Sequence, residues 1–120
     1  MSDPLYREII LEHFKNPHNY GVVEKADIDV REYNPLCGDD IRITAKIKDK
    51  NIEKIAFVSS GCAISKASAS IFTDMVKDKK IKEIKDMKPE ELLEELGTEL
   101  TPGRLKCALL AFSTLKKGLK

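Results

Sequence analysis

The most regular pattern in the chain is an alternation of apolar and polar side chains over residues 41–48. One face of such a strand is buried, while the other face meets water. A short turn at residues 49–51 separates it from a second strand over residues 52–59, and the pair is typical of an antiparallel hairpin. Residues 27–34 predict a further strand, although their pattern is poorer.

Helical periodicity marks four other segments. The first is preceded by Asp3, a good capping residue, and begins with Pro4, which suits the first helical position. Thr101 and Pro102 repeat this combination at the start of the last helix. Residues 78–88 are charged and show no clear periodicity. The helices are predicted over residues 4–14, 63–77, 89–97 and 102–117.

The order of the predicted elements is one helix, two or three strands, and then three helices. Strands grouped before helices favour an α+β domain, here with a three-stranded antiparallel sheet that is covered by helices on one face. A chain of 120 residues is long enough for a single modest hydrophobic core. We therefore predict one domain over residues 1–120.

Composition and charge exclude several classes of function. The chain has 21 basic and 20 acidic residues and a net charge of +1, so its bulk charge does not favour nucleic-acid binding. No apolar run approaches the ~20 residues of a membrane span. Residues 1–4 lack the features of a signal peptide, and a cytoplasmic protein without membrane contact is predicted. The lysine-rich residues 77–82 are interpreted as a solvated segment, with a partner-docking patch as the alternative.

The chain has three cysteines, Cys37, Cys62 and Cys107. In a reducing compartment, metal ligands, reactive thiols or buried side chains are favoured over disulfides. An odd number of cysteines supports this interpretation, because at most two of them could pair.

Each of the first two cysteines has a functional and a structural interpretation. Cys37 stands before Gly38 and Asp39 and is either a ligand or an incidental residue of a tight turn. Cys62 lies where a strand gives way to a helix, and the N–H groups at a helix start stabilise a thiolate. Its structural alternative is a small buried hydrophobic side chain.

Cys107 lies in the second turn of the last predicted helix. On a helical wheel it points roughly 140° away from the centre of the apolar stripe of that helix. The neighbouring side chains of Arg104 and Lys106 could stabilise its thiolate.

Three thiolates and the Asp39 carboxylate are four anionic groups that could bind a metal. Soft sulfur ligands suit zinc or an iron–sulfur centre, whereas one hard oxygen ligand binds a soft centre less firmly. The paired C-x-x-C spacing of a structural zinc knuckle is absent. Spacing alone does not bring the four residues together, so the residues favour a metal or cluster site and leave its metal open.

Three motifs carry a resemblance to a known family. They are ILEHFKNPHNYG at residues 10–21, NPLCGD at residues 34–39 and GCAIS at residues 61–65, with Cys107 in the expected last helix. Over nearly its whole length the sequence resembles the IscU/NifU/SufU family of iron–sulfur cluster assembly scaffolds. The resemblance implies a SufE/NifU-like α+β fold.

The resemblance also implies a function. Cys37, Asp39, Cys62 and Cys107 would hold a 2Fe–2S cluster, built from iron and from persulfide sulfur that a cysteine desulfurase supplies. The cluster would then pass to recipient apo iron–sulfur proteins or carriers, which makes the chain a scaffold rather than an enzyme. Asp39 would leave one corner of the cluster labile. Cys107 is the expected first acceptor of the persulfide, and Lys106 is a candidate modulator.

A departure from the IscU pattern beside the third cysteine keeps an alternative function open. Many IscU proteins have a histidine directly before the third cysteine, where this chain has Lys106. Arg104-x-Lys106-Cys107 is more similar to the SufU branch, whose members bind zinc and relay sulfur. The short separation between Cys62 and Cys107 is IscU-like, because SufU proteins usually have an insertion there. A zinc-dependent sulfur-transfer protein is the alternative, followed by a zinc-stabilised structural domain.

The remaining expectations concern partners and histidines. Residues 100–104, LTPGR, differ from the Leu-Pro-Pro-Val-Lys stretch of IscU proteins that a dedicated Hsp70-type chaperone serves, so this partner is not expected. His13 and His18 lie outside the cysteine motifs, and we predict a structural or solvent-facing role for each. The native metal, the recipient proteins and a homo-oligomeric state are left open.

Overall fold

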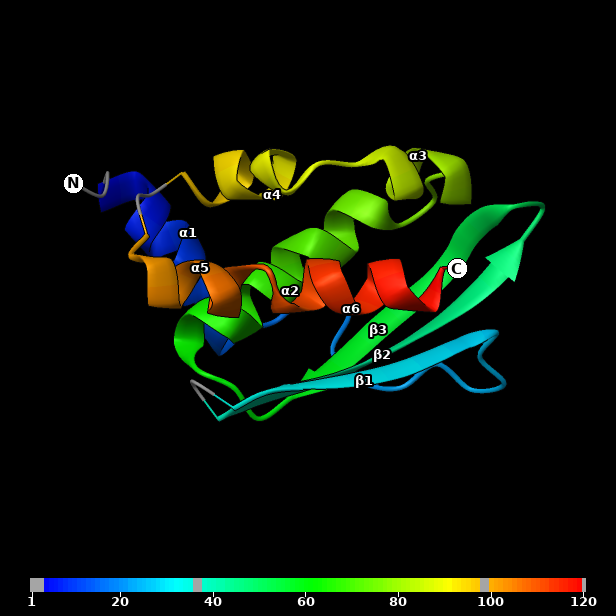
Figure 1. Cartoon of the computed structure of the whole chain (residues 1–120), viewed down its shortest axis with the longest axis horizontal. Helices are drawn as coiled ribbons and strands as arrows, with labels where there is room; N and C mark the ends of the chain where they lie inside the picture. The colour runs from blue at the N-terminus through cyan, green and yellow to red at the C-terminus, as the bar shows by residue number, and fades with distance from the viewer. Residues whose placement is uncertain (1–3, 36–37, 98–99, 120) are drawn as a thin grey trace.

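The computed structural model describes residues 4–35, 38–97 and 100–119. An antiparallel sheet in the order β1-β2-β3 lies on one side of the molecule, and the helices gather on one of its faces (Figure 1). This arrangement confirms the predicted α+β class. The strands are β1 (Ile28–Asn34), β2 (Asp39–Lys48) and β3 (Asn51–Ser59). The helices are α1 (Pro4–Lys15), α2 (Ala63–Val76), α3 (Ile81–Asp86), α4 (Pro89–Leu96), α5 (Pro102–Ala108) and α6 (Leu110–Gly118).

The predicted hairpin is β2 and β3, joined by a two-residue turn. Asp49 and Lys50 both have positive φ, 53° and 67°, as a turn that matches the twist of antiparallel strands requires. On the inner face of the sheet, Ile43 lies opposite Phe57 and opposite Val30 of β1. The poorly patterned β1 is also formed, because α6 packs against its inner side.

Helix α2 is the central helix, and it contacts β3 and the helices α1, α4, α5 and α6. Its small side chains Ala67, Ser68 and Ala69 are completely buried, which lets neighbouring elements approach closely. Phe72 of α2 packs near Phe112 of α6, with 5.7 Å between ring centroids.

One prediction about helices needs correction, and one unassigned stretch gains a helix. The last predicted helix is divided into α5 and α6 at Leu109, whose φ of −98° and ψ of 3° depart from helical values. No Pro or Gly marks this position, so local sequence signals did not indicate the break. The unassigned charged stretch contains α3, because Ile84 is fully buried and anchors one turn of helix among charged residues.

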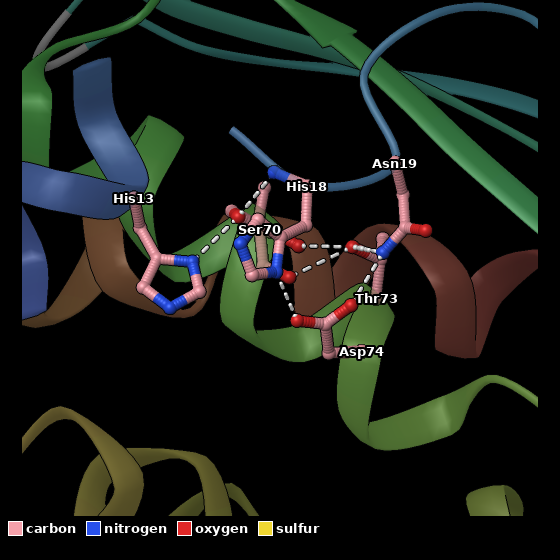
Figure 2. A network of polar contacts seen from close by, with 7 residues as sticks. His13, His18, Asn19, Ser70, Thr73 and Asp74 are labelled. Atoms are coloured by element: carbon pink, nitrogen blue, oxygen red, sulfur yellow. Dashed lines mark hydrogen bonds and ion pairs between the residues drawn. The ribbon is translucent and has the colours of Figure 1, made fainter. Parts of the chain in front are cut away.

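The connector between α1 and β1 is hydrogen-bonded to both the sheet and α2. The backbone of Asn19 and Gly21 bonds to Phe57 at the edge of β3. His13 and His18 contact Ser70 and other polar residues of α2 (Figure 2). Burial of its imidazole, and next the nearby His18, lower the pKa of His13. Among the described residues, no helix is both long and apolar enough to cross a membrane.

The close approach of α6 to β1 gives a test of the packing. A Cβ at Gly118 would lie 2.9 Å from methyl groups of both Ile28 and Val30. Gly118→Ala should therefore lower the free energy of unfolding by about 1–3 kcal/mol in urea denaturation. In α5, Gly103→Ala meets nothing within 4 Å and should be neutral or raise it by about 0.5–1 kcal/mol. If both substitutions changed the free energy of unfolding equally, this packing would be contradicted.

Candidate metal centre

Three of the predicted site residues meet at one end of the sheet, although they come from distant parts of the sequence. Asp39 begins β2, Cys62 caps the N-terminus of α2, and Cys107 lies in α5. One carboxylate oxygen and the two sulfur atoms all lie within 4.8 Å of one another. Pairing of β2 with β3 and packing of α5 on α2 bring these three positions together.

The carboxylate of Asp39 is buried, with 1% of the residue exposed. Its Oδ1 accepts a hydrogen bond from the backbone N–H of Cys62 at 2.8 Å, and its Oδ2 lies 3.7 Å from the Cys62 sulfur. A buried carboxylate needs such partners, because leaving it unpaired is costly. The start of β2 is thereby tied to the start of α2.

Cys62 is the N-cap of α2, in an extended conformation. Its Sγ accepts a long hydrogen bond from the backbone N–H of Ser65, at 3.5 Å. A negative charge on this sulfur would face the positive end of the helix dipole. The hydroxyl of Ser65 is buried and has no hydrogen-bond partner in the described part of the chain, so a polar donor stands beside the centre.

Close contacts around residue 61 explain why the second cysteine motif begins with a glycine. A Cβ at this position would lie 2.9 Å from Asp39 Oδ1 and 3.0 Å from the Ser65 hydroxyl. Real Cβ atoms almost never come so close to another atom. Any larger residue would therefore push the buried carboxylate away from the N-terminus of α2.

Cys107 is buried, with 2% of the residue exposed. Together with Cys62 it lines an open hollow of about 300 Å³, whose other walls are Thr101, Gly103 and Arg104. The wheel placed Cys107 away from the apolar stripe of its helix. In the structure, Cys107 lies in the wall of a hollow that Cys62 also lines.

The other two predicted site residues are Cys37 and Lys106. Cys37 lies outside the described residues. Lys106 is exposed and lines a separate hollow beside Glu32 and Tyr33. Within the described ranges it forms no hydrogen bond or ion pair with Asp39. Arg104 is instead the cation that shares a hollow with the two thiols.

The sequence did not point to the residues that hold the backbone leading to Cys62 in place. Asp40 points away from the core, and its Oδ1 accepts hydrogen bonds from the backbone N–H and the hydroxyl of Ser60, at 2.9 and 2.7 Å. These bonds lower the pKa of Asp40. The hydroxyl of Ser59 donates to the Asp40 carbonyl at 2.6 Å. The only sequence signal was a pair of aspartates followed, one strand later, by a pair of serines.

The donor set fits a thiophilic metal. Around tetrahedral zinc, two sulfur ligands stand about 3.8 Å apart, given Zn–S bonds of about 2.3 Å, which is compatible with the observed limit of 4.8 Å. Two sulfurs and one carboxylate leave one position for another ligand. The same donors suit a small iron–sulfur cluster, which also takes thiolate ligands.

The comparisons with known proteins show the family to which the chain belongs. Residues 5–120 match the NifU-like N terminal domain, so the protein is a member of that family. A curated relative, the zinc-dependent sulfurtransferase SufU of Bacillus subtilis (strain 168), is 38% identical over 136 residues, covering 98% of this chain and 90% of that protein.

Two other known proteins are similar to this chain. The iron–sulfur cluster assembly scaffold protein IscU 1 of Archaeoglobus fulgidus is 36% identical over 115 residues, covering 96% of this chain and 74% of that protein. The solved structure of a nitrogen-fixing NifU-like protein (N-terminal) from Brucella abortus has a TM-score of 0.76 at 21% identity, and covers 95% of this chain and 91% of that one. At this identity it supports the fold alone. The family match and the two curated relatives confirm the family that the sequence motifs indicated.

The contact between Gly61 and Asp39 predicts how the centre responds to substitution. Gly61→Ala should weaken zinc binding at the centre by about tenfold or more, as changes to the groups that orient metal ligands commonly do. Competition with a chromophoric chelator measures this affinity. Gly103→Ala adds the same methyl group to the wall of the hollow without a close contact. If it weakens binding equally, the displaced carboxylate is not the cause.

Proposed function

We propose that this chain is a scaffold on which a 2Fe–2S cluster is assembled and from which it passes to recipient apo-proteins or carriers. The iron and the sulfide are its cargo, with sulfur supplied as a persulfide by a cysteine desulfurase. We further infer that it works in the cytoplasm as a single domain over residues 1–120. Its role is that of a scaffold rather than an enzyme.

The observation that carries this proposal is the convergence of Asp39, Cys62 and Cys107 within 4.8 Å. Cys37 stands two residues before Asp39 in the sequence and is the fourth proposed ligand. The family membership and the IscU and SufU relatives support a role in iron–sulfur cluster assembly. An open hollow beside the two thiols leaves room for cargo to enter and leave.

The first chemical step is the acceptance of sulfur. A thiolate of the scaffold attacks the outer sulfur of the desulfurase persulfide. A new S–S bond forms on the scaffold cysteine, and the desulfurase thiolate leaves. Cys107 remains our proposed acceptor, because Arg104 lines the same hollow and its guanidinium favours the thiolate. Reduction of the transferred sulfur to sulfide then takes two electrons from an external reductant.

The carboxylate of Asp39 accounts for release of the cluster. An oxygen ligand binds a soft iron–sulfur centre less firmly than a thiolate does. The backbone N–H of Cys62 competes with iron for the same carboxylate. One corner of the cluster is therefore held weakly, which suits a centre that must be handed on.

A zinc-dependent sulfur-transfer function is the second candidate, with one thiol relaying a persulfide while zinc occupies the centre. It is favoured by the 38% identity to the zinc-dependent sulfurtransferase SufU, and by the Arg104-x-Lys106-Cys107 arrangement. In this function Lys106, which is exposed, serves as a modulator from outside the centre. Two sulfur donors and one carboxylate also suit zinc.

Anaerobic reconstitution tests the scaffold proposal. With iron, cysteine and a cysteine desulfurase, the protein should acquire a visible-absorbing cluster, and Cys62→Ser should abolish it. Equal numbers of iron and acid-labile sulfide atoms should be recovered. If the intact protein forms no visible-absorbing cluster under these conditions, it is not a scaffold.

Replacement of the oxygen ligand tests the labile corner. Asp39→Ala should slow loss of the cluster several-fold, followed as the decay of visible absorbance or as transfer to an apo-ferredoxin. Asp86→Ala removes an exposed carboxylate from α3 and should leave the rate unchanged. Circular dichroism of both variants confirms the fold. An unchanged or faster loss in Asp39→Ala would argue against the labile corner.

Metal analysis of freshly and anaerobically purified protein separates the two candidate functions. Iron with sulfide is the result expected for the scaffold. One zinc ion per chain, together with persulfide transfer and no cluster, would establish the zinc-dependent relay instead. Folded metal-free protein that still accepts sulfur would exclude a purely structural zinc domain, because such domains need the metal in order to fold.

A further inference from the structure

We propose that His13, His18 and Asp74 form a second metal site, which takes a divalent transition-metal ion that prefers nitrogen and oxygen ligands, such as Zn²⁺. One ring nitrogen from each histidine and one carboxylate oxygen lie within 4.8 Å of one another. Two imidazoles and a carboxylate are a common ligand set for such ions. This inference does not depend on the proposed scaffold function.

The three side chains come from different segments; His18 is directed at Asp74, and His13 at Ser70 beside them (Figure 2). His13 lies near the end of α1, His18 in the connector that follows, and Asp74 in the last turn of α2. The imidazole centroids are 4.5 Å apart, and His18 Nδ1 lies 2.5 Å from Asp74 Oδ2. Nitrogen and oxygen ligands of tetrahedral zinc stand about 3.3 Å apart. Because His18 and Asp74 are about half exposed, their side chains can rotate to reach this ligand spacing.

Neighbouring polar groups hold the three candidate ligands in place. The buried hydroxyl of Ser70 is hydrogen-bonded to His13 Nδ1 at 2.7 Å, and it accepts the backbone N–H of His18 at 2.8 Å. Asn19 Nδ2 donates to Asp74 Oδ1 at 2.9 Å, which leaves Oδ2 directed at the histidines. The bond from Asn19 leaves the second carboxylate oxygen free to act as a ligand, as the supporting bonds of metal sites in proteins do.

The position of Asp74 favours a cation. The last turn of a helix carries the negative end of the helix dipole, where a carboxylate is disfavoured and a positive ion is stabilised. That turn of α2 contains no basic residue. Among the described residues, Asp74 bonds to His18 and Asn19 and forms no ion pair with a Lys or Arg. A bound divalent ion would offset this charge.

The surroundings also leave space for an ion and its water ligands. A hollow of about 340 Å³ adjoins the cluster and is lined by His13, Asp74, Glu95 and the apolar side chains of Ile9, Ile71 and Met75. Glu95, an exposed residue of α4, brings another carboxylate to the hollow. The ion would therefore complete its coordination with water or with this carboxylate.

The proposed site is separate from the thiol centre. Cys62 and Asp74 stand at opposite ends of α2, about 18 Å apart along the helix axis at 1.5 Å per residue. An ion between His13, His18 and Asp74 would join α1 and the connector to α2. Its binding should stabilise the attachment of the N-terminal helix.

Zinc titration of the metal-free protein tests the proposal. The intact chain should bind two equivalents, and the ring-nitrogen NMR resonances of both histidines should shift. His18→Ala should lose one equivalent, with the affinity at this site falling by at least about tenfold, and should keep the thiol-bound ion. Cys62→Ser should show the reverse, so the two sites are distinguished. Asn19→Gly, which keeps the positive φ of 59° at this position, should weaken the histidine site by about tenfold.

A matched pair of carboxylate variants provides the control. Asp74→Asn should abolish binding at the histidine site, while Asp86→Asn, in the exposed turn of α3, should bind as the intact chain does. Histidine resonances that stay in place when the intact chain is saturated with zinc would overturn the proposal. Equal zinc binding by the intact chain and His18→Ala would do so as well.

Discussion

Close packing around α2 is the constraint on which the rest of this structure depends. Ala67, Ser68 and Ala69 have no exposed surface, and their small size lets the sheet and four other helices approach one helix. Because α2 is held from several sides, its two ends are fixed relative to the neighbouring elements. The thiol centre lies at its N-terminus and the histidine cluster at its C-terminal end, so both sites use the rigidity of the same helix.

The buried carboxylate of Asp39 links this packing to chemistry. Its hydrogen bond from the Cys62 backbone joins the beginning of β2 to the beginning of α2. Gly61 must lack a side chain for this contact to form. A group that helps to close the fold is thereby also a proposed metal ligand. Binding and loss of a metal at this end of the molecule would therefore act on the same contact that holds β2 to α2.

The two ends of α2 differ in the metals that they suit. The N-terminal end offers sulfur with one oxygen, whereas the C-terminal end offers two ring nitrogens and one oxygen. Softer ligands select iron–sulfur centres or zinc, while imidazole and carboxylate suit divalent ions such as zinc. The helix dipole also differs between the two ends, since its positive end faces the Cys62 sulfur and its negative end lies near Asp74.

The sequence by itself determined the strands of the hairpin, the order of the elements and the α+β class, because alternation and helical periodicity are local properties. It also determined the family, through three motifs in order. It did not reveal the break between α5 and α6 at Leu109, where there is no Pro or Gly. It also did not reveal the turn of helix around Ile84. Those features depend on burial against distant elements.

The candidate sites were likewise determined partly by the sequence and partly by the tertiary structure. The sequence named Asp39, Cys62 and Cys107 as candidates, but only the tertiary structure brought them within 4.8 Å, because strand pairing and helix packing join positions that the chain separates. The tertiary structure also separated Lys106 from the two thiols and placed Arg104 beside them. His13 and His18 looked like isolated residues in the sequence. Asp74 lies more than 50 residues later in the chain, and only the packing of α1 and the connector on α2 makes it their neighbour.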